Sequence, residues 1–363
     1  MSAADRPIPV TILTGFLGSG KTTLLNRLLK RPSLAGAAVI INEFGAIGLD
    51  HLLIEASEEQ FTLLDNGCVC CTVRGDLVAT LKALDRRSRD GGLPGLTHVL
   101  IETTGLADPA PILHTLMAEP DLAGRYVVAG IVTTVDAVNG PATLDRHAEA
   151  AKQVAVADRL LVTKADLVAD EALSALRHRL AALAPAARQS LARNGETDFD
   201  LMDITHSAMA SDAREVAAWL DISAYECGPD CAHDHPGHHH GPGEHHVHAH
   251  HGIQSYSFVI DEPVEWSAFA RWLDYVAVLK GEDLLRLKGL VHVTDQPGRP
   301  LVLHGVQHVF HPPVRLDAWP SADRRTRLVF IVRDIDRETI ARTLVKFASI
   351  DPASIGAPSR AAA

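Results

Sequence analysis

A glycine-rich segment near the start of the chain constrains its fold more than any other feature. Residues 15–22 have the form Gly-x-x-x-x-Gly-Lys-Thr and lie between an apolar run at 10–14 and a helical pattern at 21–30. The apolar run predicts a buried strand. Glycines then allow the backbone to curl with its N–H groups toward phosphate oxygens. This order of strand, loop and helix predicts a loop that binds nucleotide phosphates, with a chance match in a turn as the alternative.

Further apolar runs alternate with helical patterns through the first part of the chain. The runs lie at residues 38–41, 97–101, 127–135, 159–163 and 204–207. Such alternation predicts a mostly parallel sheet that is covered by helices on both faces. We therefore expect an α/β fold of the P-loop NTPase type for the first domain.

Composition changes sharply after residue 222. Residues 223–252 are rich in Cys, His, Gly and Pro and contain little that can be buried, which is typical of a flexible linker. A pattern of antiparallel strands and two helices follows, which predicts a smaller α+β C-terminal domain. The expected organisation is a P-loop domain at 1–222, the linker at 223–252, the α+β domain at 253–350 and a tail at 351–363.

The phosphate loop and one strand end supply the expected catalytic groups. The expected nucleotide-binding residues of the loop are Gly15, Gly18, Ser19, Gly20, Lys21, Thr22 and Thr23. Lys21 is expected to reach the β- and γ-phosphates, and Thr22 to place its hydroxyl on Mg²⁺. Glu102 follows an apolar run and is expected to hold Mg²⁺ or to orient the attacking water, with helix capping as the alternative.

A second motif indicates which base the nucleotide carries. Thr163, Lys164 and Asp166 follow the apolar run that begins at residue 159, in the order Thr-Lys-x-Asp. A carboxylate in this place accepts two N–H groups from guanine, whereas adenine cannot donate both. Lys164 would lie along the purine face. The motif therefore favours GTP over ATP, although the same four residues also fit a turn before a helix.

Three of the five cysteines lie within four residues, at Cys68, Cys70 and Cys71. Asn66-Gly67 predicts a turn that allows this short segment to offer two or three thiolates to one ion. Thiolates suit Zn²⁺, Co²⁺ and Cu⁺, so the cluster does not choose the metal. The alternatives are a redox pair, which usually has two residues between its cysteines, and small buried side chains.

The other two cysteines open a histidine-rich tract inside the linker. Its expected accessory ligands are Cys227, Cys231, His233, His235, His238, His239 and His240. Imidazole binds borderline ions such as Zn²⁺, Ni²⁺ and Co²⁺. We expect a metal reservoir of low specificity, with a solubilising linker as the alternative.

Charge and hydropathy exclude other classes of function. The formal net charge of −11 disfavours a nucleic-acid partner. No apolar run approaches the roughly 20 residues that cross a bilayer, so we expect no membrane span. We expect a cytoplasmic protein, because thiols stay reduced there and clustered cysteines then favour metal binding over disulfides.

Taken together, these motifs resemble the CobW-like GTPases, a group of metal-transfer chaperones related to HypB and UreG. The matching segments are residues 14–23, 42–45, 66–71, 102–105 and 163–166, with 286–289 and 305–307 in the C-terminal part. The resemblance implies a slow GTPase whose nucleotide state controls a Zn²⁺ or Co²⁺ site at Cys68, Cys70 and Cys71. It also implies a first switch segment at 42–50, in which Asp50 is expected to act as a ligand or to position water.

The expected function is delivery of Zn(II) or Co(II) to a client metalloprotein, driven by GTP with Mg²⁺. The client is the expected partner, and a nucleotide-dependent homodimer is a further option. Two alternatives remain open, a P-loop kinase for a small molecule and a passive zinc buffer. A kinase has no need of the cysteines or of Asp166, whereas a passive buffer would depend on the histidine tract.

Overall fold

The computed structural model describes residues 7–42, 62–63, 69–73, 77–91, 95–122, 124–200, 204 and 251–356. The chain divides into two compact units, Met1–Arg179 with Ala187–Ala210 and Ser211–Ala363 with Leu180–Ala186. None of the described helices is both long and apolar enough to cross a membrane.

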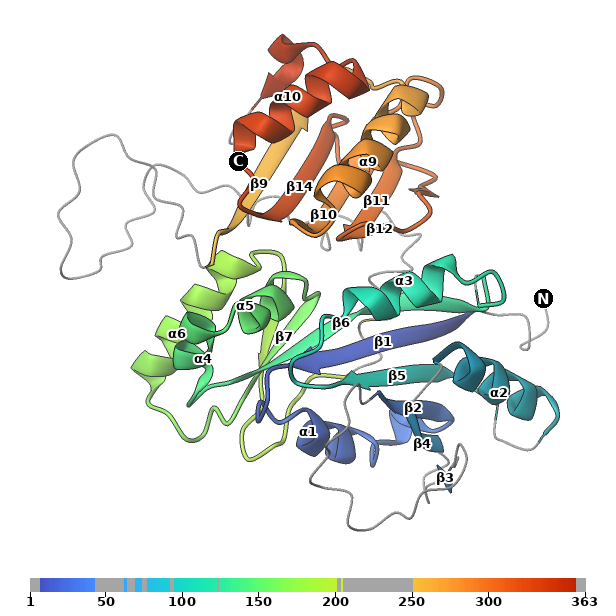
Figure 1. Ribbon diagram of the computed structural model, residues 1–363, viewed down its shortest axis with the longest axis vertical. Coiled ribbons are helices and arrows are strands. Elements are labelled where there is room, and N and C mark those ends of the chain that lie inside the picture. The colour runs from blue at the N-terminus through green and yellow to red at the C-terminus, as the bar shows by residue number, and fades with distance from the viewer. Residues whose placement is uncertain are drawn as a thin grey trace. The chain divides into compact units, whose positions relative to one another are not determined.

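The described strands of the first unit form one eight-stranded sheet, with the order β3-β4-β2-β5-β1-β6-β7-β8 (Figure 1). Its strands are β1 (Ile8–Gly15), β2 (Ala37–Asn42), β3 (Thr62–Leu63), β4 (Val69–Val73), β5 (His98–Thr103), β6 (Tyr126–Asp136), β7 (Arg159–Thr163) and β8 (Arg188–Leu191). Every pairing is parallel except that of β3 with β4. The predicted parallel α/β fold is therefore confirmed.

Helices cover both faces of this sheet. They are α1 (Lys21–Leu28), α2 (Leu77–Arg89), α3 (Ala110–Ala118), α4 (Gly140–Arg146), α5 (Ala148–Ala155) and α6 (Asp170–Leu183). The face of α1 that carries Leu24, Leu25 and Leu28 packs in one core with Leu13 and Val39 of the sheet. Figure 1 shows α1 on one side of the sheet and α3 and α5 on the other. The apolar runs are buried between these layers, which explains their near-continuous hydrophobic character.

The sequence prediction of local structure differs from the structure at three places. Residues 69–73, which contain Cys70 and Cys71, form the strand β4, which was not expected, whereas the turn expected at Asn66-Gly67 lies outside the described residues. The strand β8 (Arg188–Leu191) was not expected, because its four residues are half-exposed or exposed and carry no apolar run. The strand expected to begin at Ile204 is wrong, since that residue is helical.

The described residues 251–356 of the second unit form an antiparallel sheet with two α-helices, as the sequence predicted. Its path is β12-β11-β10-β14-β9-β15, with β13 paired to β11. The strands are β9 (Ile253–Ile260), β10 (Leu284–Val291), β11 (Leu301–Val306), β12 (Val309–Phe310), β13 (Val314–Arg315), β14 (Thr326–Arg333) and β15 (Ile355–Gly356).

The helices α9 (Trp266–Lys280) and α10 (Arg337–Ala348) begin at side-chain caps and complete one aromatic core. Glu265 accepts hydrogen bonds from the N–H groups of Ser267 and Ala268, which would otherwise lack intrahelical partners. Trp272 is fully buried, and its Nε1 donates to Thr343 Oγ1 over 3.0 Å. The core of this unit is thus closed by contacts between α9, α10 and the sheet.

Candidate nucleotide-binding site

The glycines of the phosphate loop adopt conformations that other residues rarely take. Gly15, Gly18 and Gly20 have φ angles of 139°, 72° and 91°. A Cβ on Gly15 would lie 2.3 Å from Thr134 Oγ1 and 2.8 Å from Ser19 Oγ, so no larger residue fits there. Gly20 precedes α1 directly, and the loop therefore delivers the chain to the N-terminus of a helix, which favours anions.

Lys21 is held inside this loop. Its ammonium donates to the carbonyl oxygens of Gly15 at 2.8 Å and Phe16 at 3.3 Å. Burial lowers the pKa of this ammonium below its usual value, and the Glu102 carboxylate partly offsets that effect. The loop therefore holds Lys21 beside the backbone that would cradle a phosphate.

The side-chain oxygens of Thr22 and Glu102 lie together beside the phosphate loop. Thr22 Oγ1 donates to Glu102 Oε1 over 2.6 Å, and Glu102 is 5% exposed at the end of β5. Thr103, the next residue, donates to Thr14 Oγ1 over 2.9 Å and ties β5 to β1. A hydroxyl and a carboxylate are hard oxygen donors, so this pair fits Mg²⁺. Thr23, also expected in the site, is exposed on α1.

The base-reading motif lies at the end of β7, beside the phosphate loop. Thr163 Oγ1 donates to the carbonyl oxygen of Ser19 over 2.7 Å, and Lys164 Nζ donates to that of Gly18 over 3.1 Å. Asp166 Oδ1 accepts a 2.7 Å hydrogen bond from the backbone N–H of Asn194. The two bonds join residues 144 and 146 apart in the sequence, so the phosphate loop and the base-reading motif form one connected edge of the sheet.

Asp136 is a further site residue that the sequence analysis missed. It is 7% exposed at the end of β6, and its Oδ2 lies 2.7 Å from Lys164 Nζ and 2.9 Å from Asn139 Nδ2. Burial pushes the pKa of this carboxyl upward, but hydrogen bonds from Lys164 and Asn139 hold it below its usual value. The signal that could have found Asp136 is its position after an apolar strand, as with Glu102, because parallel strands place their carboxyl ends at one edge.

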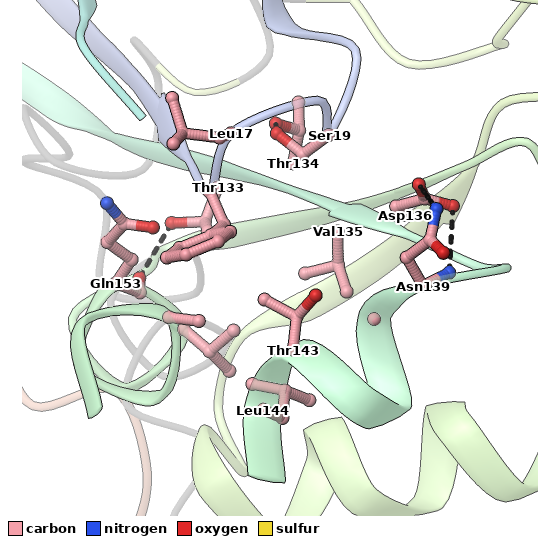
Figure 2. A pocket seen from close by; sticks show the side chains of 14 residues that line it. Leu17, Ser19, Thr133, Thr134, Val135, Asp136, Asn139, Thr143, Leu144 and Gln153 are labelled. Carbon is pink, nitrogen blue, oxygen red and sulfur yellow. Dashed lines mark hydrogen bonds between the residues drawn. The ribbon is translucent and has the colours of Figure 1, made fainter. Parts of the chain in front are cut away.

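A pocket lies beside the phosphate loop, between β6, α4 and α5 (Figure 2). Polar and apolar residues of the phosphate loop, of β6, and of the helices α4 and α5 all contribute to its lining. Lining residues labelled in Figure 2 include Leu17, Ser19, Thr134, Val135, Thr143 and Leu144. Phe16 also lines the pocket, and its ring stacks on His147 with centroids 4.5 Å apart. Phe16 of the phosphate loop thus packs against the start of α5.

Gln153 and Lys152 of α5 hold the loop that follows Glu102. Gln153 Nε2 donates to the carbonyl oxygens of Gly105 at 3.2 Å and Ala107 at 3.0 Å. Lys152 Nζ lies 2.7 Å from Asp108 Oδ2. A Cβ on Gly105 would lie 2.6 Å from the backbone nitrogen of Leu17, so this loop touches the phosphate loop. The loop that follows Glu102 is therefore held by α5 on one side and by the phosphate loop on the other.

Most of the expected metal ligands lie outside the described residues. These are Asp50, Cys68, Cys227, Cys231, His233, His235, His238, His239 and His240. Cys70 and Cys71 belong to β4, where their backbone pairs with Val39 and Ile40 of β2. Within the parts of the chain that the structure describes, no group of three or more His, Cys, Asp or Glu side chains is arranged to hold an ion.

A glycine loop before a helix, a hydroxyl–carboxylate pair that fits Mg²⁺ and an aspartate after a strand, all at the carboxyl edge of a parallel sheet, are typical of a P-loop nucleotide-binding protein. Residues 9–190 match the CobW/HypB/UreG nucleotide-binding domain, and residues 253–348 match the cobalamin synthesis protein cobW C-terminal domain. The chain therefore belongs to the CobW/HypB/UreG family, a family of GTPases, as the resemblance predicted.

Individual relatives resemble nearly the whole chain. The zinc chaperone YjiA of Escherichia coli (strain K12) is 32% identical over 92% of this chain and 96% of its own length. The zinc-regulated GTPase metalloprotein activator 1 of Schizosaccharomyces pombe is 30% identical over 92% of this chain and 82% of its own length.

A solved structure of similar extent supports the fold. The crystal structure of Zn(II)-bound YjiA GTPase from E. coli covers 94% of this chain and 99% of its own, with 30% identity and a TM-score of 0.71. A Zn(II)-bound triple mutant of that GTPase, in which one glutamate and two cysteines are replaced by alanine, aligns with a TM-score of 0.69.

Proposed function

We propose that this chain is a GTP-hydrolysing zinc chaperone that binds Zn(II) at Cys68, Cys70 and Cys71 and delivers it to a client metalloprotein. Relatives of similar length that are described as zinc chaperones and as a zinc-regulated GTPase support this function. We propose Zn(II) rather than Co(II) as the cargo on the same grounds. A reducing compartment such as the cytosol would keep the thiolates available.

The observation that carries the proposal is the register of three neighbouring strands. Ile40 of β2 pairs with Cys71 of β4 on one side and with Ile101 of β5 on the other. Since adjacent strands lie about 4.8 Å apart, the backbone of Cys71 is about 10 Å from that of Ile101. Glu102 is the next residue, and it bonds to the Thr22 hydroxyl. A movement of Glu102 at the Mg²⁺ position would therefore pass from β5 through β2 to Cys71 of β4.

The chain's own groups have distinct tasks in this function. Lys21 and the loop N–H groups bind the phosphates, and Asp166 binds the guanine base. Thr22 and Glu102 would hold Mg²⁺, which would supply positive charge to the phosphates. Glu102 also orients the attacking water, and Asp50 assists from the switch segment. The γ-phosphate then controls the loop at 104–108, which Gln153 and Lys152 hold in place.

The thiolate site is tested by competition against a zinc chelator of known affinity. The double variant Cys70→Ser with Cys71→Ser should lose the tight Zn²⁺ site, whereas Cys227→Ser with Cys231→Ser is the matched control and should keep it. The measurement must report affinity rather than the presence of zinc, because a relative's mutant that lacks two cysteines is also Zn(II)-bound. Wild-type affinity in the first variant would remove the proposed site.

The guanine site is tested with Asp166→Asn. An amide donates where the carboxylate accepts, so this variant should lose GTP affinity and gain affinity for xanthosine triphosphate. A P-loop kinase that uses ATP would show no such exchange. An unchanged preference for GTP in the variant would therefore favour the kinase alternative or another base site.

A further inference from the structure

A short turn after β8 lies beside the base-reading motif. The N–H of Ala192 donates to the carbonyl oxygen of Val162 over 2.8 Å, and the N–H of Ala165 donates to that of Ala192 over 3.2 Å. The turn itself is closed by two backbone bonds between Arg193 and Glu196, of 2.9 and 2.8 Å. The chain at Ala192 therefore lies beside the Thr163–Asp166 segment where it leaves the sheet.

Asn194 at the centre of the turn aims the Asp166 carboxylate. Its φ angle is 50°, in the left-handed region, which turns its N–H toward Asp166 Oδ1 at 2.7 Å. A carboxylate has about four lone-pair sites, so one backbone bond orients it and leaves capacity for two purine N–H groups. The direction of the carboxylate thus depends on the conformation of the turn.

Arg27 of α1 holds this turn from outside. Its Nη1 donates to the carbonyl oxygen of Asn194 and lies 3.2 Å from Glu196 Oε1. A Cβ on Gly195 would lie within 2.8 Å of Nη1, Cζ and Nε of Arg27, so the guanidinium packs directly on the glycine. With side-chain exposures of 40% and 79%, the Arg27–Glu196 ion pair adds little by itself. The turn is therefore held by the hydrogen bond from Arg27 to the carbonyl oxygen of Asn194 rather than by the ion pair.

We infer that Arg27 is a positioning residue for guanine recognition: it fixes the Asn194–Gly195 turn, whose N–H orients Asp166. Because α1 begins at Lys21, one helix then carries the phosphate-binding lysine and the group that aligns the base-reading carboxylate. This inference rests on the proposal that Asp166 binds guanine.

Arg31, three residues after the end of α1, provides a matched control. Its Nη1 donates to the carbonyl oxygen of Phe199 over 2.7 Å, and its Nη2 donates to that of Thr197. It therefore binds the same loop beyond the turn, without a contact to Asn194 or Gly195 among its described hydrogen bonds. Arg31→Ala removes the same charge and side-chain length as Arg27→Ala.

The test compares GTP with inosine triphosphate, which lacks the 2-amino group and so offers one N–H fewer to Asp166. In full-length Arg27→Ala, affinity for GTP should fall about tenfold, the size of one misaligned charged hydrogen bond, with inosine triphosphate affected much less. The preference for GTP should therefore shrink, and KM for GTP should rise while kcat stays within about twofold. Arg27→Lys, which retains a donor, should restore part of the preference, and Arg31→Ala should keep the wild-type value.

A second variant makes the test independent of the stability of Arg27→Ala. Gly195→Ala places a methyl group against the guanidinium and should reduce the same preference. An unchanged preference in both variants, or an equal loss of affinity for both nucleotides, would overturn the inference. Asp166→Asn separates the two proposals: if it keeps the wild-type preference, the guanine site itself fails, and if it alone loses the preference, only the role of Arg27 fails.

Discussion

Thr22 and Glu102 are joined by a hydrogen bond of 2.6 Å between Oγ1 and Oε1, although 80 residues separate them in the chain. The bond connects the first turn of α1 to the end of β5. Thr22 and Glu102 would together hold Mg²⁺, and a change in their positions would act on β5, which β2 separates from β4 and its cysteines.

The first prediction concerns the charge of Glu102. Glu102→Gln keeps the shape of the side chain but removes its negative charge, which holds Mg²⁺ and orients water in the proposed mechanism. Single-turnover hydrolysis of GTP should slow by about a hundredfold or more, whereas GDP affinity should change by less than about fivefold. An unchanged rate would remove Glu102 from the proposed machinery.

Gln153 should be needed to hold the loop after β5. It is 2% exposed and makes two hydrogen bonds to backbone carbonyls of that loop. Gln153→Ala should lower the free energy of unfolding by about 1–3 kcal/mol and slow hydrolysis. Urea denaturation and steady-state turnover measure the two effects. The control, Lys152→Ala, breaks the more exposed ion pair with Asp108 and should cost less than about 1 kcal/mol. Equal effects of the two variants would contradict this account.

His98 should make the first unit sensitive to acid. Burial is the main reason that its pKa falls from 6.5 to about 4, while Asp200 opposes the shift. The unfolded chain therefore binds a proton that the folded chain does not, so stability is kept above about pH 6.5 and is lost as the pH falls toward 4. Between about pH 7.5 and about pH 5 this costs about 2 kcal/mol.

The variant His98→Gln isolates this contribution, because every other titrating group is unchanged. The loss of stability between the two pH values, measured by urea denaturation, should be about 2 kcal/mol smaller in the variant than in the wild type. If the variant and the wild type lost the same stability between the two pH values, His98 would not have the lowered pKa that its burial requires.

Deletion of residues 227–252 separates a chaperone from a passive buffer. The deletion removes two cysteines and all ten histidines of the tract, so the number of weakly bound metal ions per chain should fall. The affinity of the tight site and the GTPase rate should stay within about twofold, because neither depends on the tract in this account. Equilibrium dialysis against Zn²⁺ gives both the number and the affinity. Loss of the tight Zn²⁺ site in the deletion variant would favour the passive-buffer alternative.

The parts of the site that lie at strand ends could be read from the sequence. The phosphate loop, Glu102 and Asp166 each follow an apolar run, and parallel strands bring such residues to one edge. Asp136 follows the same rule, but without a motif it was overlooked. The strand at 69–73 was also missed. Asn66-Gly67 suggested a turn, while the pairing of Cys71 with Ile40 depends on a segment about 30 residues earlier.

Other contacts could not be predicted because they join residues that are far apart in the chain and belong to no common sequence motif. Arg27 and Asn194 lie 167 residues apart, and Gln153 and Gly105 lie 48 apart. Each pair forms only after the sheet brings its helices and loops together. Long polar side chains on helices usually face solvent, so neither Arg27 nor Gln153 differs in sequence from an ordinary surface residue.

The most direct test of the central claim is the affinity for Zn²⁺ in the presence of GTPγS, of GDP and of no nucleotide, measured by chelator competition on the full chain. Coupling through β2 and β5 predicts that the affinities with GTPγS and GDP differ by about fivefold or more, and that Zn²⁺ changes GTPγS affinity relative to GDP by the same factor. The difference should vanish in Cys70→Ser with Cys71→Ser. Equal zinc affinities in all three nucleotide states would contradict the account, because the cysteine segment would then not respond to the nucleotide.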